Sequence, residues 1–342
     1  MGQNIRRRAT IKDVASAAGV SLKTVSRVIN NEAGVSDDLV RRVEQAVTEL
    51  DYRHNLAASN LRRGQRTASI GVLLHDLGNS FSGTLLRAIE DQARSRRIAV
   101  FSASLDDDPE REALLATDLI SRRIDGLVLM PTSDDQSYLR ADIRAGLAVF
   151  AVDRPANGVE IGTVVVDNAG GARKATAHLA GRGHRRIACL TDSDSIWTAV
   201  QRRQGYLDGL AEYGVPLTED FVVSGLATAD QATTAVLAMM RDAAPPTAIF
   251  AGRNDLTIGA VRALREIGKQ NRVAVVGFDD FPTSDLFTPA ITVVRQDVHA
   301  TGACVANMLF ARMEGAANAP ERVVLPTTLV SRGSGELLPE PK

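Results

Sequence analysis

Apolar and polar residues follow two different patterns along the chain, and the change falls near residue 67. Before it, apolar residues recur three and four positions apart, which predicts short amphipathic helices. After it, short runs of valine, isoleucine, leucine and alanine alternate with longer amphipathic stretches, which predicts strands alternating with helices. The chain is therefore expected to hold a small helical domain followed by a larger α/β part.

The helical domain is expected to contain three short helices. Thr10 followed by Asp13 is the start signature of the first helix, and Gly19 interrupts it where a tight turn can use positive φ. Ser21 can cap a second helix that runs from Leu22 to about Asn30, and a third helix follows. Two short helices joined by a glycine-containing turn form a helix-turn-helix.

The second helix has a polar outer face. In a helix-turn-helix this helix enters the major groove of DNA and presents its first residues to the base edges. Arg27 can donate two hydrogen bonds to guanine, Lys23 can reach guanine or a phosphate, and Leu22 can only pack, for instance on a thymine methyl group. Phosphate contacts, which position the protein without reading sequence, suit Thr24, Ser26 and Asn30. A plain three-helix bundle would show the same polar face, so the pattern alone leaves both interpretations open.

The α/β part reads as two rounds of buried strands. The first round is ASIGVLLHDL, IAVFSASL, IDGLVLMP and LAVFAVD, and the second is TVVVDN, RIACLTD, FVVSG, AIFAG and RVAVVGF. Helices are predicted near 82–97, 109–123, 136–145, 169–182, 197–213, 229–242, 254–267 and 298–315. Continuous apolar strands alternating with helices indicate parallel sheets covered on both faces, so two doubly wound lobes are expected.

Polar residues stand where the predicted strands end, at His75–Asp76, Asp153–Arg154, Asp192, Asn254–Asp255, Asp279–Asp280 and Gln296–Asp297. Open parallel sheets bind ligands at the carboxyl ends of their strands, so these residues are expected to line a cleft between the lobes. Together they suit a site that reads hydroxyl groups, with an arginine beside a ring oxygen or an anionic group. An aspartate after a strand can equally cap the next helix, and both interpretations stay open for Asp76, Asp192, Asp255 and Asp280.

Composition agrees with this organisation. A chain of 342 residues suits two or three domains, and its 44% hydrophobic content can bury a sizeable core. No run approaches the roughly 18 apolar residues of a membrane helix, and no apolar segment follows the basic N-terminus as a secretory signal requires. Cys189 and Cys304 lie in apolar contexts without metal-ligand spacing, so they are expected to be buried thiols of a cytosolic protein.

The net charge of −1 conceals an asymmetry. Residues 1–66 hold 12 Lys+Arg and 7 Asp+Glu, whereas the rest of the chain holds 28 and 34. A basic N-terminal domain on an acidic body is expected when only that domain meets a polyanion, although a solvated basic face would look similar.

The exact amino-acid sequence of the N-terminal domain says more about its function than the apolar and polar pattern does. The segments DVASAAGVS, TVSRVIN and YRHNLAASNLRRG closely resemble the head-piece of the LacI/GalR family of bacterial repressors. The resemblance implies that the base-reading positions are Leu22, Lys23 and Arg27. It also implies a hinge helix from Asn55 to Asn60 that forms on operator DNA beside its twin from a second subunit. Ala58 is small enough for that packing, and Leu61 matches the family's leucine wedge in the minor groove. Without the resemblance a plain linker would be favoured, because so short a helix is marginal in water.

The α/β part resembles the family's effector-binding core, which is similar to periplasmic sugar-binding proteins. The family's pocket positions fall on Asp153 of VDR, Arg202 of RxxG, Asn254 of ND, Asp279 of GFDD and Gln296 of RQD. His75 joins them at the end of the first strand. Phe81 lies in NSFS where the family has NPFF, so a second aromatic and a proline are missing. Trp197 is a further departure, and stacking on a sugar face and packing between the lobes remain equally open for it. A sugar or polyol is favoured over a purine by a small margin.

Two other classes of protein are weighed against this interpretation. An α/β enzyme is disfavoured because the sequence has no G-x-G-x-x-G after the first strand, no G-x-x-x-x-G-K-[ST], no G-x-S-x-G and no H-E-x-x-H. A periplasmic-type sugar-binding protein would share the α/β part but would leave residues 10–62 unexplained. No catalytic residue, cofactor or metal is expected.

The expected fold is α/β, with an N-terminal three-helix helix-turn-helix head-piece and hinge over residues 1–65. A periplasmic-binding-protein-like core of two doubly wound parallel sheets follows over residues 66–342. Its lobes are expected at about 67–165 plus 297–324, and at 166–296 plus 325–342. The expected function is sequence-specific transcriptional regulation, most simply repression, in the cytoplasm at the nucleoid. Expected partners are palindromic double-stranded operator DNA, a sugar-like effector that controls operator affinity allosterically, and a second copy of the chain in a homodimer, with no membrane.

Overall fold

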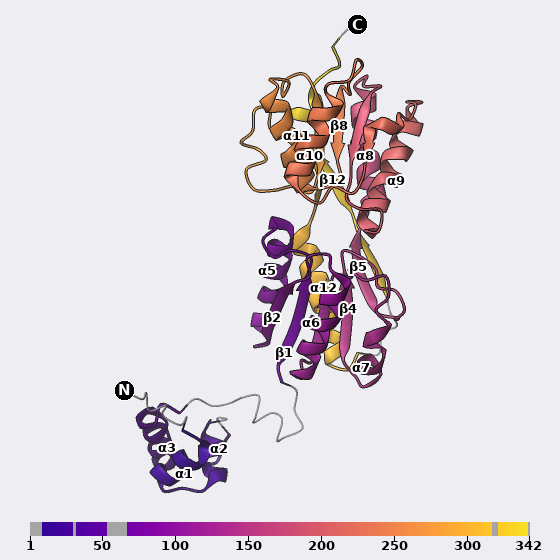
Figure 1. Cartoon of the computed structure of the whole chain (residues 1–342). Coiled ribbons are helices and arrows are strands. Elements are labelled where there is room, and N and C mark those ends of the chain that lie inside the picture. The colour runs from indigo at the N-terminus through magenta and orange to yellow at the C-terminus, as the bar shows by residue number, and fades with distance from the viewer. Residues whose placement is uncertain (1–8, 30–31, 53–66, 317–320, 341–342) are drawn as a thin grey trace, which may run out of the picture. The chain divides into compact units, whose positions relative to one another are not determined.

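The computed structural model describes residues 9–29, 32–52, 67–316 and 321–340 (Figure 1). The chain divides into two compact units, an N-terminal unit (Met1–Thr67) and a C-terminal unit (Ala68–Lys342).

The N-terminal unit contains α1 (Ile11–Ala18), α2 (Leu22–Ile29) and α3 (Asp37–Glu49). Helix α1 begins as predicted, because the Asp13 carboxylate accepts hydrogen bonds of 2.7 Å from the backbone N–H and the hydroxyl of Thr10. It ends at Gly19, whose φ of +63° opens the turn to α2. The prediction of three helices with a glycine turn is confirmed.

A small core holds these helices together. Its fully or nearly buried residues are Val14, Ala15, Ala18, Val25, Val43 and Ala46. The Arg42 guanidinium on α3 also donates to the Ala18 carbonyl oxygen at 2.6 Å, which fastens α3 to the end of α1. Val25 is the single buried residue of α2. The core therefore leaves most of the surface of α2 available for contact with another molecule.

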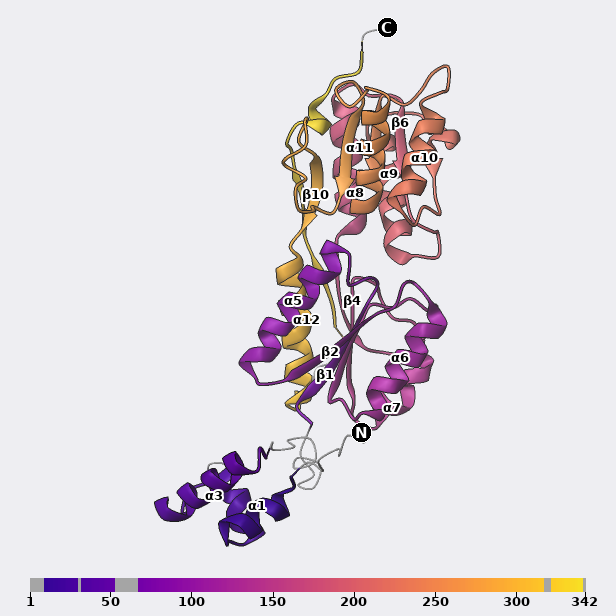
Figure 2. The same cartoon turned by 60° about the vertical axis from the view of Figure 1, so that its left-hand side comes forward.

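The C-terminal unit contains two six-stranded sheets, each the centre of one lobe (Figures 1 and 2). The first lobe has the strand order β11-β5-β4-β3-β1-β2. Its strands are β1 (Ser69–Leu74), β2 (Ala99–Ser104), β3 (Gly126–Leu129), β4 (Ala148–Val152), β5 (Gly162–Val166) and β11 (Arg322–Leu325). Helices α5 (Ser80–Ser95) and α12 (Val298–Met313) cover one face, and α6 (Pro109–Ser121) and α7 (Arg140–Arg144) cover the other (Figure 2).

The second lobe repeats this order as β12-β10-β9-β8-β6-β7. Its strands are β6 (Ile187–Leu190), β7 (Val222–Val223), β8 (Ala248–Ala251), β9 (Ala274–Phe278), β10 (Thr292–Gln296) and β12 (Thr327–Val330). Helices α8 (Asn168–Gly181) and α9 (Trp197–Glu212) cover one face, and α10 (Ala229–Met239) and α11 (Asn254–Glu266) cover the other (Figure 1). Short 3₁₀ turns lie at Ser137–Leu139, Glu219–Phe221 and Ser334–Glu336.

The α/β class with two parallel-dominated sheets is confirmed, with two corrections. Strand β5, predicted as the start of the second round, belongs to the first sheet, where it pairs with β4. Strand β12 runs antiparallel to β10, whereas the other strand pairs are parallel. Strands β11 and β12 were not predicted, since both are short and only partly buried. Pro326 separates them, and the chain passes there from the first sheet to the second. The lobes are thus joined by three crossings, after β5, after β10 and after β11.

Candidate functional site

Helix α2 presents the residues proposed to read DNA. Leu22 is 45% exposed, and Lys23 is exposed beside it. Thr24 donates its backbone N–H to the Ser21 hydroxyl at 3.1 Å, so Ser21 caps the helix as predicted. Ser26 is partly buried on the same helix.

The Arg27 side chain contacts other residues of the N-terminal unit. Its guanidinium donates to the Ala33 carbonyl oxygen and lies 3.7 Å from the Glu32 carboxylate. A contact of Arg27 with a base would replace these interactions. Four other residues proposed for DNA contact lie outside the described part of the chain, namely Asn30, Asn55, Ala58 and Leu61.

A cavity of about 270 Å³ lies between the two lobes of the C-terminal unit. The first lobe lines it with Asp107, Arg154, Pro155, Asn157 and residues 131–134, and the second lobe with Asp192, Ser193, residues 195–197, Gly225 and Ala227. These residues follow the carboxyl ends of β2, β3, β4, β6 and β7. The cavity is therefore at the place where open parallel sheets bind ligands.

The first-lobe wall carries an ion pair centred on Asp107. Asp107 Oδ1 lies 2.7 Å from Arg154 Nη1, and Asp107 Oδ2 lies 3.1 Å from His75 Nδ1. Burial alone would raise the pKa of Asp107, but the hydrogen bond from His75 and the charge of Arg154 outweigh it and hold the pKa well below its usual range. Asp107 is therefore an anion at neutral pH, and His75 stands behind it rather than in the lining.

A buried glutamate shapes the same wall. Glu112 is completely buried and accepts hydrogen bonds from the backbone N–H groups of Thr132 and Ser133 at 2.5 and 3.0 Å. It also accepts from Gln136 Nε2 at 3.1 Å and from the Tyr138 hydroxyl at 2.8 Å. The loop that supplies residues 131–134 of the lining is therefore tied to α6 through one carboxylate.

The second-lobe wall mirrors this arrangement. Asp192 Oδ1 lies 3.1 Å from Arg253 Nη1, and Arg253 Nη2 lies 3.5 Å from Asp255. Burial raises the pKa of Asp192, and the charge of Arg253 opposes that rise. Neither Asp192 nor Asp255 is the N-cap of a helix. Asp192 lines the cavity, and Asp255 lies behind it in the first turn of α11.

A buried polar cluster lies at the ends of β9 and β10. Arg202 donates to Asn168 Oδ1 at 2.8 Å, to the Gly252 carbonyl oxygen at 2.7 Å and to Asp279 Oδ2 at 3.3 Å, and its guanidinium lies 3.8 Å from the centre of the Phe278 ring. Gln296 Nε2 donates to Asp279 Oδ1 at 2.5 Å.

Gly205, one turn after Arg202 on α9, allows this cluster to form. A side chain there would lie 2.1 Å from the Ala169 carbonyl oxygen of α8. The absence of a side chain therefore lets α9 approach α8 closely enough for Arg202 to reach Asn168.

Side chains from both lobes meet beside the site. The Asn79 side chain, at the start of α5, donates to Asn254 Oδ1 and to Asp255 Oδ2, both at 3.1 Å. The Arg322 guanidinium of β11 lies 5.2 Å from the centre of the Trp197 ring. Trp197 thus lines the cavity and also packs against the other lobe, which are the two roles that the sequence left open.

Several buried polar atoms around the cavity have no hydrogen-bond partner in the described part of the chain. They are Thr132 Oγ1, Thr191 Oγ1, Arg154 Nε, Arg253 Nε and Gln296 Oε1. A buried polar atom without a partner costs about 1–3 kcal/mol. A ligand with both donors and acceptors, such as hydroxyl groups, would remove part of that cost.

The structure brings most of the proposed effector residues together. Asp153, Arg202, Asp279 and Gln296 belong to one buried cluster, in which the charges of Arg202 and Asp279 shift the pKa of Asp153 in opposite directions. Of the proposed effector residues, only Trp197 lines the cavity itself. Phe81 is placed elsewhere, because it packs on the first-lobe core and lines a separate hollow with Phe281 and Arg332. Sequence reasoning missed Asp107, Glu112 and Arg253 as parts of the site.

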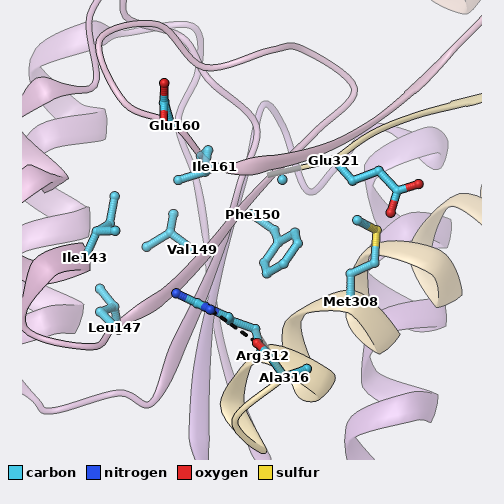
Figure 3. A pocket seen from close by; sticks show the side chains of 11 residues that line it. Ile143, Leu147, Val149, Phe150, Glu160, Ile161, Met308, Arg312, Ala316 and Glu321 are labelled. Carbon is cyan, nitrogen blue, oxygen red and sulfur yellow. Dashed lines mark hydrogen bonds between the residues drawn. The ribbon is translucent and has the colours of Figure 1, made fainter. Parts of the chain in front are cut away.

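A second, smaller cavity of about 120 Å³ lies inside the first lobe (Figure 3). Its lining is mostly apolar and includes Phe150, Leu147 and Met308, at the amino ends of β4 and β5 and the end of α12. Arg312 lies among these side chains and donates to the Ala316 carbonyl oxygen at 3.2 Å. Because it belongs to one lobe and carries few polar partners, we place the ligand in the larger cavity between the lobes.

Among the described residues, no group of His, Cys, Asp and Glu has the arrangement of a metal site. The described helices also include none that is long and apolar enough to cross a membrane.

Comparison with known proteins gives consistent matches over the whole chain. Residues 10–55 match the model of bacterial regulatory proteins of the lacI family, and residues 176–335 match a periplasmic binding protein-like domain. The HTH-type transcriptional regulator DegA of Bacillus subtilis (strain 168) is 31% identical over 334 residues, which cover 96% of this chain and 98% of that protein.

Two solved structures extend the match. The lac repressor dimer bound to operator and the anti-inducer ONPF aligns with a TM-score of 0.85 at 27% identity, over 97% of this chain and all of that one. The complex of the transcriptional regulator CelR with cellobiose aligns with a TM-score of 0.71 at 29% identity, over 96% of this chain and all of that one.

Proposed function

The chain belongs to the lacI family of bacterial regulatory proteins, and on that premise we propose that it is a repressor whose operator affinity is set by a polyhydroxylated ligand between its lobes. It is a helix-turn-helix transcriptional regulator, as its relatives are. The observation that carries the ligand proposal is the cavity lined by both lobes, with buried polar atoms that lack partners.

The proposed ligand is a sugar or a related polyol. Hydroxyl groups both donate and accept, which suits a cavity where the buried Arg154 Nε donor lacks a partner and the carboxylates of Asp107 and Asp192 accept. CelR, which aligns over nearly the whole chain, was solved with cellobiose. Because both lobes line the cavity, a ligand there would change the preferred angle between them, and coupling of about 1–3 kcal/mol is typical of allosteric control.

The proposed DNA contacts are those of α2, with Leu22, Lys23 and Arg27 at the base edges and Thr24, Ser26 and Asn30 at phosphates. Asn55, Ala58 and Leu61 are proposed to act in the hinge. Contact with a palindromic operator needs two helix-turn-helix units, so a homodimer is proposed. The edge strand β2 supports this, because Phe101 is 46% exposed there. Action on DNA implies work in the cytoplasm, by binding and without a catalysed reaction.

The proposal is tested in two steps on the purified full chain. A thermal-shift panel of sugars, polyols, nucleosides and purines identifies ligands, since a ligand that binds only the folded state raises the melting temperature. Any hit is then added to an operator-binding titration at fixed salt concentration. A ligand that stabilises the protein but leaves operator affinity unchanged would contradict the allosteric role.

Arg27→Ala tests the DNA surface. Loss of a bidentate guanine contact should weaken operator binding by about 1–3 kcal/mol, or roughly five- to 150-fold, while ligand affinity stays the same. Arg41→Ala is the control, because Arg41 is an exposed arginine of α3 outside the proposed reading face. Unchanged operator affinity of Arg27→Ala, measured by fluorescence anisotropy, would remove Arg27 from the interface.

A further inference from the structure

The cavity between the lobes carries an excess of carboxylates. Its charged lining residues are Asp107, Asp134 and Asp192 on the acidic side and Arg154 on the basic side. Asp107 and Arg154 come from the first lobe and Asp192 from the second, so both walls contribute a carboxylate. Asp134 is exposed at the rim.

The cations near the cavity are already paired with carboxylates. Arg154 lies 2.7 Å from Asp107 and 3.8 Å from the buried Asp153. Arg253, behind the other wall, lies 3.1 Å from Asp192 and 3.5 Å from Asp255. Each of the two guanidinium groups therefore faces two carboxylates. Its positive charge is already neutralised by them and is not available to attract an anionic ligand.

The remaining basic groups near the cavity do not offset its excess of carboxylates. Arg202 is paired with Asp279 at 3.3 Å and shares its other donors with Asn168 and the Gly252 backbone. Arg322 covers the Trp197 ring but does not line the cavity. His75 Nδ1 lies 3.1 Å from Asp107 Oδ2, and it adds a positive charge only when it is protonated.

We infer that the cavity selects ligands without negative charge, namely an unphosphorylated polyol or an amino sugar, and excludes sugar phosphates and sugar acids. The inference rests on the proposed function and narrows its ligand class. A carboxylate only accepts hydrogen bonds, so Asp107 and Asp192 require donors from the ligand. Hydroxyl and ammonium groups donate, whereas an ionised phosphate or carboxylate offers acceptors and meets like charges on both walls.

The test uses matched ligands on the purified full chain. The sets are D-glucose with D-glucosamine, D-glucose 6-phosphate and D-gluconate, D-ribose with D-ribose 5-phosphate, and cellobiose with cellobionate. Within any set that binds, the neutral or amino member should bind at least about tenfold more tightly than the anionic member, because like charges brought together in a buried site are strongly unfavourable. Titration calorimetry measures the ratio.

The outcomes separate this inference from the function on which it rests. An anionic member that binds as tightly as its neutral partner overturns the charge selection and leaves the regulator with a cavity ligand intact. If no member of any set binds, the result contradicts both the charge selection and the proposed sugar or polyol ligand.

Asp192→Asn locates the effect. Removal of this carboxylate frees the charge of Arg253, so the preference for the neutral member should fall about tenfold as the anionic member gains affinity. Asp194→Asn is the matched control, since Asp194 lies two residues away, pairs with Arg203 at 3.4 Å and does not line the cavity. Its preference should equal that of the wild type.

A second variant keeps the inference open to test if Asp192→Asn does not fold. Asp134→Asn changes an exposed lining carboxylate, and it should reduce the preference by about twofold to threefold because solvent screens exposed charges. An unchanged preference in folded Asp192→Asn, or in Asp134→Asn where that variant alone folds, overturns the inference.

Discussion

The two lobes place an aspartate at the same point of the same fold, but they surround it differently. Asp153 follows β4 and Asp279 follows β9, the third strand in each sheet order. Both have positive φ, +66° and +70°, and both donate their backbone N–H to the next strand, to the Val164 and Val294 carbonyl oxygens at 2.9 Å. Backbone geometry is therefore conserved between the lobes at this position.

The side-chain partners are not conserved. Asp279 accepts hydrogen bonds from Arg202 and Gln296. In the part of the chain that the structure describes, the Asp153 carboxylate has an ion pair of 3.8 Å with Arg154 and no hydrogen bond. Burial raises the pKa of Asp153 despite the charges of Arg154 and Arg202. In the second lobe Asp279 is held by Arg202 and Gln296, a cluster here called the platform, whereas Asp153 of the first lobe has only its ion pair with Arg154 among the described residues.

The largest effect should come from removing the platform. Arg202→Ala leaves Asp279 buried without its cation and also removes the stacking on Phe278. Breaking a buried ion pair in this way typically costs about 3–5 kcal/mol. Urea unfolding should therefore show a large loss of stability, and ligand response should disappear while the N-terminal unit still binds operator.

Arg203→Ala is the control for that experiment. Arg203 is the next residue on α9, and its pair with Asp194 is much more exposed, so the loss should be about 0–1 kcal/mol. Equal losses in the two variants would show that the platform has no special stability.

The same change on the two aspartates should have opposite signs. Asp279→Asn weakens a satisfied pair and lowers stability, whereas Asp153→Asn removes an incompletely paired buried charge and should raise stability at neutral pH by about 1 kcal/mol. The folded-state pKa of Asp153 is raised, so its stabilising contribution is present below the unfolded pKa and is lost as pH rises through the folded pKa. The gain from Asp153→Asn should therefore appear on raising the pH above about 4 and vanish below it.

Denaturant titrations between pH 3 and pH 8 measure this difference. Ligand affinity of Asp153→Asn should fall even though the free protein is more stable. A variant that is less stable than the wild type at pH 7 would refute the contrast between the two lobes.

Sequence patterns pointed to part of the buried polar cluster, because strand ends are visible in them. Asp153, Asp279 and Gln296 follow buried strands directly, whereas Arg202 was implied by the family resemblance alone. Gly205, one turn after Arg202, lets its helix pack closely. Asp107 was missed although it lies just beyond β2, whose parallel partner β1 ends directly before His75. Treating that strand end like the others would have found it.

Other parts of the fold and the site could not be predicted from the apolar and polar pattern of the sequence. Glu112 is on a helix, and its partners are loop backbone groups that no spacing reveals. Strands β11 and β12 are too short and too exposed to show a clear period, so the third crossing between the lobes and the antiparallel edge could not be inferred. Phe81 was predicted from the family resemblance alone, and in the structure it lines a separate hollow with Phe281 and Arg332.

A smaller effect is expected where the two lobes meet. Asn79→Asp keeps the cap on the Phe81 N–H but sets a carboxylate against Asp255, which the Asn79 amide now contacts at 3.1 Å. Loss of the interlobe hydrogen bonds should cost about 1 kcal/mol and open the lobes. Small-angle scattering of the ligand-free protein should show a larger radius of gyration, with Asn79→Ser, which keeps a cap without the charge, in between. An unchanged radius in Asn79→Asp would mean that this contact does not hold the lobes together.

The smallest effect on stability is expected from the exposed contact between the lobes at Arg322 and Trp197. Arg322 is exposed and lies 5.2 Å from the Trp197 ring, a contact worth about 0.5–1 kcal/mol at most. Arg322→Ala should therefore change stability by no more than that and leave ligand affinity unaltered. Trp197→Leu removes the same contact and also the ring that lines the cavity. If the ring stacks on a sugar, only Trp197→Leu loses affinity. If both variants keep wild-type affinity in calorimetry, Trp197 serves the contact between the lobes, and ligand recognition rests on the polar walls alone.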